Sequence, residues 1–495
     1  MAEGTTLRKL ADIAGARIEY GGETLRVAEV GLNTATLSPG ALFAALPGTR
    51  VHGARFAFDS PAGAILTDED GFAIIQGTDE RRPVLVVDDV RAILGAVSAE
   101  VYGHPSAELT LIGITGTSGK TTTSYLLEQG LAAAGLKVGL IGTTGTRIAG
   151  EAVPTSLTTP EAPTLQALFR QMVDAGVTHV VMEVSSHALE LGRVNASHFD
   201  AAGFTNLSQD HLDFHPTMED YFAAKARFFD PASALAADKA VICIDDAWGE
   251  RMAELAEHPM TVAARGQDAT ITARAVSKDA LGAQVVEVKA ATTVSFELHL
   301  PGDFNIANAA VAVGLAQAVG VDLERVAEGL ARVRVPGRME RIDCGQDFLA
   351  VVDYAHKPAA VAAVLSTLRA QVDGRIGVVV GCGGDRDASK RPIMGAEAAR
   401  GADFVVVTDD NPRSEDPAAI RAAVVAGARE AETNAEIVEY ASRREAIEAA
   451  VAWAGSGDAV VVVGKGHEVG QIVGDTVLHF DDREEVRRAL AKENA

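Results

Sequence analysis

The stretch that most constrains this chain is residues 109–123, LTLIGITGTSGKTTT. An apolar run leads into Gly116, Gly119 and Lys120, and a segment of helix-forming composition follows, SYLLEQGLAAAG. Glycines let the backbone wrap around a phosphate, so that successive N–H groups and the N-terminus of the next helix point at the anion. The order of strand, glycine-rich turn and helix therefore predicts a nucleotide-phosphate loop, although Ile114 replaces the first glycine of the general G-x-x-x-x-G-K-[ST] pattern.

Lys120 has the position of the lysine that reaches the β- and γ-phosphates in such loops. A hydroxyl from the next two residues would then lie on Mg²⁺. The residues expected to contact the nucleotide here are Gly116, Thr117, Ser118, Gly119, Lys120, Thr121 and Thr122.

The composition restricts the possible partners. At 495 residues the chain is too long for one core. Its formal net charge of −24 argues against a nucleic-acid or anionic-membrane surface. Three scattered cysteines, without a C-x-x-C pair, indicate neither a disulfide nor zinc, and the N-terminus lacks the apolar segment of a signal peptide. We expect a cytoplasmic monomer that acts on small molecules and does not insert into a membrane.

The pattern of apolar runs predicts an α/β fold in three domains. Residues 1–107 form a small α/β unit, which by sequence alone could be only a packing domain. Residues 108–336 alternate strand-like runs with helical segments, as a parallel sheet requires. Within them, residues 265–300 alternate polar and apolar side chains, which predicts an antiparallel edge or insertion. The α/β alternation restarts over residues 337–495, and the segment 334–338 is the expected hinge.

Candidate metal ligands follow the strand-like runs of the central part. Glu183 ends the run HVVME, and a carboxylate at a strand end beside a phosphate loop suits Mg²⁺. It could equally be an acid in a surface turn. His211 lies in NLSQDHLDFH, either as a second ligand or as an ordinary polar loop histidine.

Lys225 shares a predicted helix face with Phe222 and Phe229 in DYFAAKARFFD. Such a lysine usually extends its ammonium group to solvent. If it is instead buried, its pKa falls and the free amine can take up CO₂. The resulting carbamate would be an anion able to hold Mg²⁺.

Charged and polar residues end four apolar runs of the last part. They include Arg386 after Gly383-Gly384, Arg413 in the segment 410–413 (DNPR), and Glu468 in the segment 464–468 (GKGHE). Ligands of open α/β sheets bind beyond the carboxyl ends of the strands, and arginine pairs well with carboxylates. The pattern favours a site for a zwitterion with more than one charged group. A solvated network of ion pairs is the alternative.

Taken together, these motifs resemble those of the Mur ligases along nearly the whole chain. The matching segments are TGTSGKTT (115–122), TTP (158–160), MEVSSHAL (182–189), HLDFH…YFAAKARFF (211–229), GDFNIANAAVA (302–312), PGRMER (336–341), DYAHKP (353–358), GGDRDASKRP (383–392), DNPRSEDP (410–417) and GKGHE (464–468). The resemblance also accounts for Ile114, because the phosphate loop of this family is shorter than the general pattern.

The resemblance implies a fold and an activity. The N-terminal domain would bind a UDP-linked substrate. The central domain would have the parallel sheet of a P-loop ATPase, and the C-terminal one would be Rossmann-like. The implied reaction is ATP-dependent addition of meso-2,6-diaminopimelate to UDP-N-acetylmuramoyl-L-Ala-D-Glu through an acyl phosphate, in peptidoglycan precursor synthesis. In this family the sequence DNPR accompanies diaminopimelate, whose additional carboxylate Arg413 would bind.

The resemblance also assigns roles residue by residue. The implied catalytic residues are Lys120, Glu183, His211 and Lys225. The implied Mg²⁺ ligands are Thr121, Glu183, His211 and Lys225 as N6-carboxylysine. The nucleotide site would include Asn305, Asn308, Arg338 and Asp353. The UDP-muramoyl peptide would contact Leu32, Thr34, Thr158, Thr159, Ser185 and Arg193. The incoming amino acid would contact Arg386, Asp410, Asn411, Pro412, Arg413, Gly464 and Glu468.

Two positions depart from the family pattern. Asn33-Thr34-Ala35 stands where the family has Asp-Ser-Arg, which changes the expected uridine site. Lys357 follows His356 at a position where threonine is common. Three other functions compete with the implied one: a ligase that adds L-lysine, a folylpolyglutamate-synthase-like ligase, and a non-catalytic nucleotide switch. The arginine of DNPR and the long N-terminal part argue against the first two. The third is disfavoured because every residue of the implied catalytic set is present, namely Lys120, Thr121, Glu183, His211 and Lys225.

Overall fold

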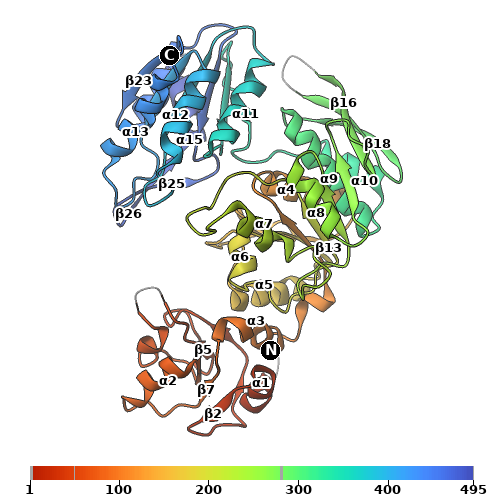
Figure 1. Cartoon of the computed structure of the whole chain (residues 1–495), viewed down its shortest axis with the longest axis vertical. Helices are drawn as coiled ribbons and strands as arrows, with labels where there is room; N and C mark the ends of the chain where they lie inside the picture. Colours follow the sequence, from red (N-terminus) through yellow and green to blue (C-terminus); the bar gives the residue numbers. More distant parts are fainter. Residues whose placement is uncertain (1–3, 49–50, 279–282, 494–495) are drawn as a thin grey trace.

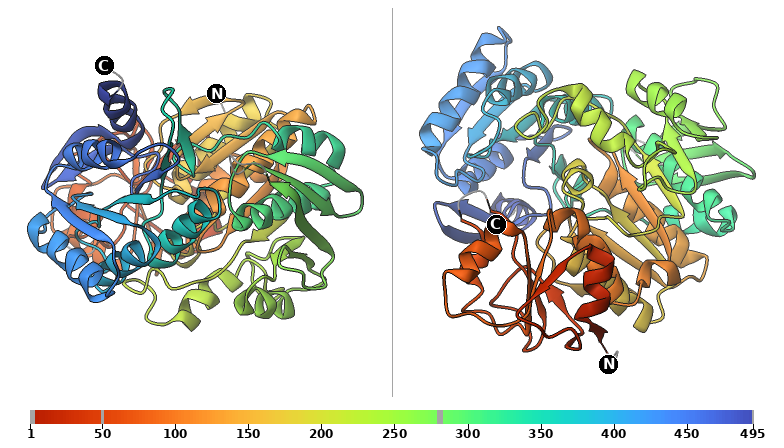
Figure 2. Two further views of the ribbon diagram at one scale, coloured as in Figure 1. Left: turned by 90° about the horizontal axis from the view of Figure 1, so that it is seen from above. Right: turned by 60° about the horizontal axis from the view of Figure 1, so that its bottom comes forward.

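Three main sheets follow one another along the chain in the computed structural model, which describes residues 4–48, 51–278 and 283–493 (Figure 1). The N-terminal unit and the C-terminal unit lie toward opposite ends of the long axis, with the central unit between them. Views from two further directions show the same three bodies (Figure 2). The mixed α/β architecture predicted from the sequence is confirmed.

The N-terminal unit is a small sheet with the order β2-β7-β6-β5-β4. The pairs β7-β6, β6-β5 and β5-β4 are parallel, and β2 is antiparallel to β7. Its elements are β1 (Thr5–Thr6), α1 (Leu7–Ala14), β2 (Arg17–Glu19), β3 (Arg26–Val27), β4 (Val30–Gly31), β5 (Leu42–Ala44), the 3₁₀ turn Gly53–Phe56, β6 (Ala64–Thr67), α2 (Glu69–Gln76), β7 (Val84–Val86), α3 (Val90–Val101) and the 3₁₀ turn Pro105–Glu108.

The central unit has an eleven-stranded sheet, ordered β11-β10-β9-β12-β8-β13-β14-β15-β16-β17-β18. Its strands are β8 (Thr110–Thr115), β9 (Val138–Gly142), β10 (Gly145–Ile148), β11 (Glu151–Val153), β12 (His179–Glu183), β13 (Ala201–Phe204), β14 (Ala240–Cys243), β15 (Met260–Ala263), β16 (Ile271–Lys278), β17 (Gln284–Lys289) and β18 (Thr293–Leu298). Its helices are α4 (Lys120–Ala133), α5 (Ala162–Asp174), α6 (Ser186–Glu190), α7 (Met218–Ala226), α8 (Ala247–Leu255), α9 (Asp303–Ala318) and α10 (Leu323–Leu330).

The middle strands of this sheet, β9 to β16 in spatial order, are parallel. Among them β8, β9, β12, β13 and β14 are apolar and buried along nearly their whole length, because helices cover both faces of the sheet. The strands β16, β17 and β18 pair antiparallel at one edge, which confirms the expectation for residues 265–300. Residues 279–282 of that range lie outside the described part of the chain.

The C-terminal unit has a six-stranded sheet, ordered β19-β20-β24-β21-β22-β23, in which only β19 is antiparallel to its neighbour. Its strands are β19 (Glu340–Ile342), β20 (Leu349–Asp353), β21 (Ile376–Val380), β22 (Phe404–Thr408), β23 (Glu436–Tyr440) and β24 (Ala459–Val463), and β25 (Val469–Val473) and β26 (Thr476–Asp481) form a separate hairpin. Its helices are α11 (Pro358–Arg369), α12 (Lys390–Gly401), α13 (Pro417–Glu430), α14 (Arg443–Trp453) and α15 (Asp482–Glu493).

Strand order decides which loops meet. In the central sheet β12, β8 and β13 are neighbours, so the loops that follow their carboxyl ends lie at one edge. In the C-terminal sheet β20, β24, β21 and β22 are neighbours, and their carboxyl ends carry the four charged motifs of that unit. Among the described helices none is long and apolar enough to cross a membrane.

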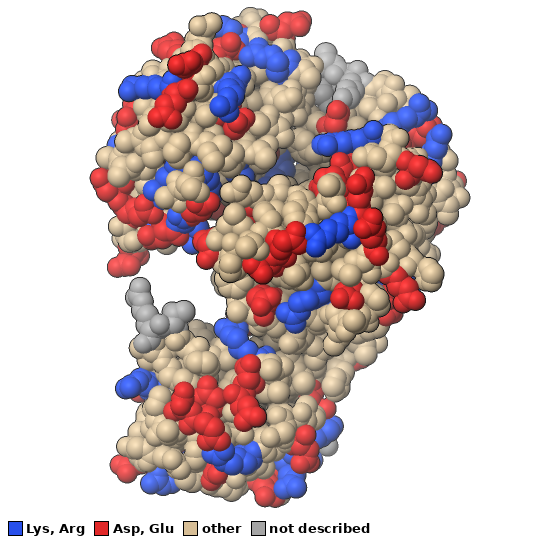
Figure 3. All heavy atoms as spheres, viewed as in Figure 1, with Lys and Arg blue, Asp and Glu red and all other residues tan. Residues whose placement is uncertain are grey.

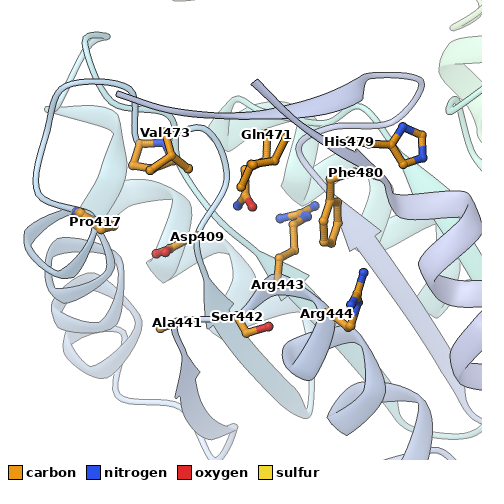
Figure 4. A pocket seen from close by; sticks show the side chains of 12 residues that line it. Asp409, Pro417, Ala441, Ser442, Arg443, Arg444, Gln471, Val473, His479 and Phe480 are labelled. Carbon is orange, nitrogen blue, oxygen red and sulfur yellow. The ribbon is translucent and has the colours of Figure 1, made fainter. Parts of the chain in front are cut away.

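A buried ion pair joins two helices of the C-terminal unit. Arg443, at the start of α14, donates from Nε and Nη2 to the carboxylate of Asp482, both at 2.7 Å, and both side chains are fully buried. Nη2 also donates to the carbonyl of Val463 at the end of β24. Figure 4 shows the guanidinium between Gln471 and Phe480, beside a cavity of about 270 Å³ under the β25–β26 hairpin.

Replacement of Arg443 by methionine is expected to lower the free energy of unfolding by about 3–5 kcal/mol, because the carboxylate of Asp482 would remain buried without a partner. Arg444→Met is the matched control. Arg444 is half exposed in its ion pair with Glu485 of α15, so the loss should stay below about 1 kcal/mol. Denaturant unfolding measures both variants. The double variant Arg443→Met/Asp482→Leu should recover much of the stability, and equal losses for the two single variants would contradict the assignment.

Candidate active site

The predicted phosphate loop connects β8 to α4, and Lys120 is the first residue of that helix. Gly116 has φ +146° and Gly119 has φ +89°. A Cβ at Gly119 would lie 2.3 Å from Oδ1 of Asn308, so the loop has no room for a side chain there. Nζ of Lys120 donates to the carbonyls of Gly116 at 2.8 Å and Thr117 at 3.1 Å. Strand, glycine turn and helix thus occur where the sequence predicts them.

Glu183 ends β12 and is buried, so its alternative interpretation as a surface-turn acid is wrong. Its Oε2 accepts hydrogen bonds from the hydroxyls of Thr121 and Thr143, each at 3.0 Å, and its Oε1 accepts one from the amide of Thr143 at 2.9 Å. A carboxylate and two hydroxyls next to the phosphate loop form an oxygen-rich set, which is the ligand chemistry that Mg²⁺ prefers.

Lys225 is fully buried in α7, so the alternative interpretation, in which its ammonium group extends to solvent, is wrong. The aromatic face was also misassigned. The helix ends at Ala226, before Phe229, and the ring beneath the amine belongs to Tyr221, whose centroid lies 4.7 Å from Nζ. Nζ donates to Oγ1 of Thr115 at 3.3 Å and to the carbonyl of Gly116 at 3.1 Å. Burial, followed by the charges of nearby lysines, holds the pKa of this amine well below its usual value.

His211 lies in the loop after β13 with φ +54°. Its Nε2 lies 3.0 Å from a carboxylate oxygen of Asp210, and its ring meets the ring of His187 edge-on, at a centroid distance of 4.9 Å. The structure thus pairs this histidine with Asp210. Its role as a metal ligand, with Thr121, Glu183 and Lys225, stays a prediction. In the described chain, the one group of three His, Cys, Asp or Glu donors that converges is His198, Asp200 and Asp238, which the sequence analysis did not select.

Residues from both later units face the loop. Asn308 donates to Oδ1 of Asn305 at 3.0 Å beside Gly119. Arg338, between the central and C-terminal sheets, donates from Nη2 to Oγ1 of Thr121 at 3.2 Å. Asp353, at the end of β20, accepts hydrogen bonds from the amides of Met339 and Ala355, both at 2.7 Å. Arg338 lies over the ring of Tyr354, which follows Asp353.

The C-terminal motifs form one polar cluster at the carboxyl ends of β22 and β24. Asn411 donates to Glu468 at 3.1 Å and accepts from Nζ of Lys465 at 2.8 Å. The same Nζ lies 3.2 Å from the buried carboxylate of Asp410. Burial favours a higher pKa for Asp410, but the charges of Lys465 and Arg443 outweigh it and lower that pKa below its ordinary value.

Arg413 and Arg386 lie beside this cluster. Nη1 of Arg413 donates to the carbonyl of Gly384 at 2.8 Å and more weakly to that of Asn411 at 3.4 Å. Arg413 has φ +51°, and its amide donates to the carbonyl of Ile472 in β25. The guanidinium of Arg386 is exposed and donates to the carbonyl of Asp385. Pro412 precedes Arg413, and Gly464 (φ +117°) lies against Asp410.

Four of the residues assigned to the UDP-linked substrate meet beside Glu183. Oγ1 of Thr159 donates to the carbonyl of Glu183 at 2.8 Å and accepts from the amide of Ser185 at 3.1 Å. Thr158 meets Thr143 through their hydroxyls, and Arg193 donates to the carbonyl of Thr159 at 3.2 Å. Arg193 also pairs with Glu161 at 2.9 Å.

The other two, Leu32 and Thr34, lie in the N-terminal unit after β4. There Oδ1 of Asn33 accepts a hydrogen bond from the amide of Ala35, which forms a local turn. Figure 3 shows the molecule hollowed on the side where the N-terminal and C-terminal units face each other. The contacts of Leu32 and Thr34 do not connect them to the phosphate loop in the described structure.

Three residues that the site assignments lacked lie in this region. Asp210 and Lys357 form an ion pair of 2.7 Å between the central and C-terminal units, and Lys465 is the buried cation of the C-terminal cluster. Lys465 belongs to the segment GKGHE, and Lys357 was noticed as a departure from the family pattern. Neither position alone signals a contact, because each contact depends on an element distant in sequence.

Comparison with known proteins identifies the class. Residues 114–316 match the Mur ligase middle domain, and residues 337–466 match the "Mur ligase, glutamate ligase domain". The chain belongs to the Mur ligase family, whose members are ATP-dependent, ADP-forming ligases.

Its relatives include the UDP-N-acetylmuramoyl-L-alanyl-D-glutamate--2,6-diaminopimelate ligase of Corynebacterium glutamicum, 62% identical over 94% of this chain and 92% of the relative. A solved structure with that same protein name is 31% identical, covers 99% of this chain and 100% of its own, and has a TM-score of 0.67. A MurF ligase from Thermotoga maritima in complex with ADP, 18% identical, shares the fold with a TM-score of 0.65 over 94% of this chain and 98% of its own.

Proposed function

We propose that this protein joins meso-2,6-diaminopimelate to UDP-N-acetylmuramoyl-L-Ala-D-Glu by an ATP-dependent reaction that forms an amide bond in peptidoglycan precursor synthesis. The Corynebacterium glutamicum relative bears the name of this activity and is 62% identical. The hydrogen bonds of Arg413 support diaminopimelate as the incoming amino acid. Its guanidinium donates only to backbone carbonyls among the hydrogen bonds of the described residues, so its charge is available to a carboxylate of the incoming amino acid.

The chemistry begins with the free carboxylate of the D-glutamyl residue. One of its oxygens attacks the γ-phosphorus of ATP, ADP leaves, and an acyl phosphate forms. An amine of diaminopimelate then attacks the acyl carbon and loses a proton, the tetrahedral intermediate expels phosphate, and the amide remains. Negative charge on the transferring phosphoryl group is the principal obstacle, and Lys120 with the amides of its loop stabilises it electrostatically.

The residues around the loop suit Mg²⁺. The hydroxyl of Thr121 and the buried carboxylate of Glu183 lie within hydrogen-bond distance of each other. His211 follows β13, the strand that pairs with β8 on the side opposite β12. Burial lowers the pKa of the Lys225 amine, which favours the neutral form that carbamylation requires, and the carbamate would add a further anionic oxygen. Magnesium, when bound, would neutralise phosphate charge as the two anions approach.

The two binding regions lie on different units, and their closure would bring the amine to the acyl phosphate and exclude water. Asn305, Asn308, Arg338 and Asp353 would hold the nucleotide. Asp410, Asn411 and Glu468, supported by Lys465, would receive the amino group of diaminopimelate, because they present carboxylate and amide oxygens beside the arginines. We further propose domains at 1–107, 108–336 and 337–495, and a cytoplasmic monomer that acts on small molecules.

Phosphate release tests the function. The purified protein is supplied with ATP, Mg²⁺ and UDP-N-acetylmuramoyl-L-Ala-D-Glu, together with meso-diaminopimelate, L-lysine or no amine. Turnover that requires both the peptide and diaminopimelate is the expected result. A preference for L-lysine would contradict the assigned substrate while keeping the ligase chemistry. Slow hydrolysis without either co-substrate would instead indicate a nucleotide switch.

A further inference from the structure

Lys357 reaches from the C-terminal unit into the phosphate loop of the central unit. It precedes Pro358, the first residue of α11, just beyond the carboxyl end of β20. Its side chain is 10% exposed. Nζ lies 2.7 Å from Oδ2 of Asp210 and donates to the carbonyl oxygen of Thr117 at 3.3 Å. A lysine of one unit thus contacts the loop that another unit provides.

Two ammonium groups converge at this point. Nζ of Lys120 donates to the same Thr117 carbonyl, at 3.1 Å. Two ammonium groups that share one acceptor repel each other. Burial lowers the pKa of Lys357, although the carboxylate of Asp210 opposes the change.

A third cation faces the same loop, because Arg338 donates to the hydroxyl of Thr121, one residue after Lys120. The carboxylate beside Lys357 is Asp210, which also pairs with His211. Glu183 accepts a hydrogen bond from the same Thr121 hydroxyl, and the charge of Arg338 acts on Asp353. The three cations thus face one loop, where their charges would attract a multiply charged anion.

We propose that Lys357 binds the terminal phosphate group of the nucleoside triphosphate, as a cation that the C-terminal unit contributes to the phosphate site. Lys120 has the position that reaches the β- and γ-phosphates, and Lys357 shares its carbonyl acceptor from the opposite side of the interface. Threonine, the residue expected at this position from the family resemblance, is too short to make this contact. A triphosphate would thereby favour contact between the two units. This inference rests on the proposed function for the identity of the nucleotide.

Nucleotide binding separates this role from a purely structural one. Calorimetry with Mg²⁺ measures the affinity of the full-length protein for ADP and for the β,γ-imido analogue of ATP, in the wild type, Lys357→Thr and Lys357→Arg. A contact to the terminal phosphate should make Lys357→Thr weaken the analogue about 10- to 100-fold. ADP affinity should change far less, and Lys357→Arg should retain most of the affinity for the analogue.

The control variant is Lys239→Thr. Lys239 donates to the carbonyl of Ala318, outside the site, and its removal should leave both affinities unchanged. Equal losses for ADP and the analogue in Lys357→Thr, or no loss for either, would overturn the inference. The ratio of the two affinities within one variant is insensitive to a partly unfolded fraction, so reduced stability cannot imitate the result. Because no peptide or amine is present, failure of the wild type to use diaminopimelate would count only against the proposed function.

Discussion

Replacement of Lys225 by alanine is expected to lower kcat by about three orders of magnitude or more. The wild-type amine is fully buried, with its Nζ 3.1 Å from the Gly116 carbonyl in the phosphate loop. With its pKa lowered, the neutral nitrogen can attack the carbon of CO₂ and lose a proton to form a carbamate. If this carbamate helps to hold Mg²⁺, as proposed, alanine would remove it and weaken the stabilisation of the transferring phosphoryl group. Phosphate release under saturating substrates measures the effect.

Two controls make this prediction specific. Short carboxylic acids such as formate or acetate should partly restore turnover to Lys225→Ala, because they supply an anion to the space that the side chain leaves. Lys225→Arg retains a positive charge and cannot form the carbamate, so it should be as inactive as the alanine variant. An active Lys225→Arg enzyme would show that the site needs a cation, and full activity of Lys225→Ala would remove any role in catalysis.

Replacement of Arg413 by alanine is expected to lower kcat/KM for meso-diaminopimelate about 10²- to 10³-fold. The guanidinium donates to the carbonyls of Gly384 and Asn411, and the backbone amide of Arg413 donates to the carbonyl of Ile472 in β25. It is therefore positioned before the substrate arrives, and the additional carboxylate of diaminopimelate would form a charge-assisted pair with it. Steady-state kinetics with diaminopimelate as the varied substrate tests this expectation.

The matched variants for Arg413 separate charge from geometry. Arg413→Lys keeps the charge but loses the planar fork, so it should recover only part of the lost kcat/KM. Any weak turnover of L-lysine, which lacks the additional carboxylate, should be unaffected by Arg413→Ala. Equal loss with both amines would show that Arg413 supports the fold of the site and does not select the substrate.

The phosphate loop, the parallel sheets and the antiparallel edge could be predicted from the sequence because each depends on local patterns. Strand-like runs of apolar residues bury both faces, and a glycine turn before Lys120 adopts backbone angles that other residues avoid. The candidate residues at strand ends follow from the same rule, since the carboxyl ends of neighbouring parallel strands meet at one edge. Their individual roles stay predictions.

The sequence by itself therefore determined the class of fold, the family and the residues worth testing. Only the tertiary structure decided that Glu183 and Lys225 are buried, that Tyr221 lies under the Lys225 amine, and that His211 pairs with Asp210. It alone also joined Lys357 to the phosphate loop, across 240 positions of the chain. The physical reason is that burial and charge pairing act through space. They depend on which strands become neighbours and on how the units pack. The spacing of residues along one segment predicts neither the strand neighbours nor the packing of the units.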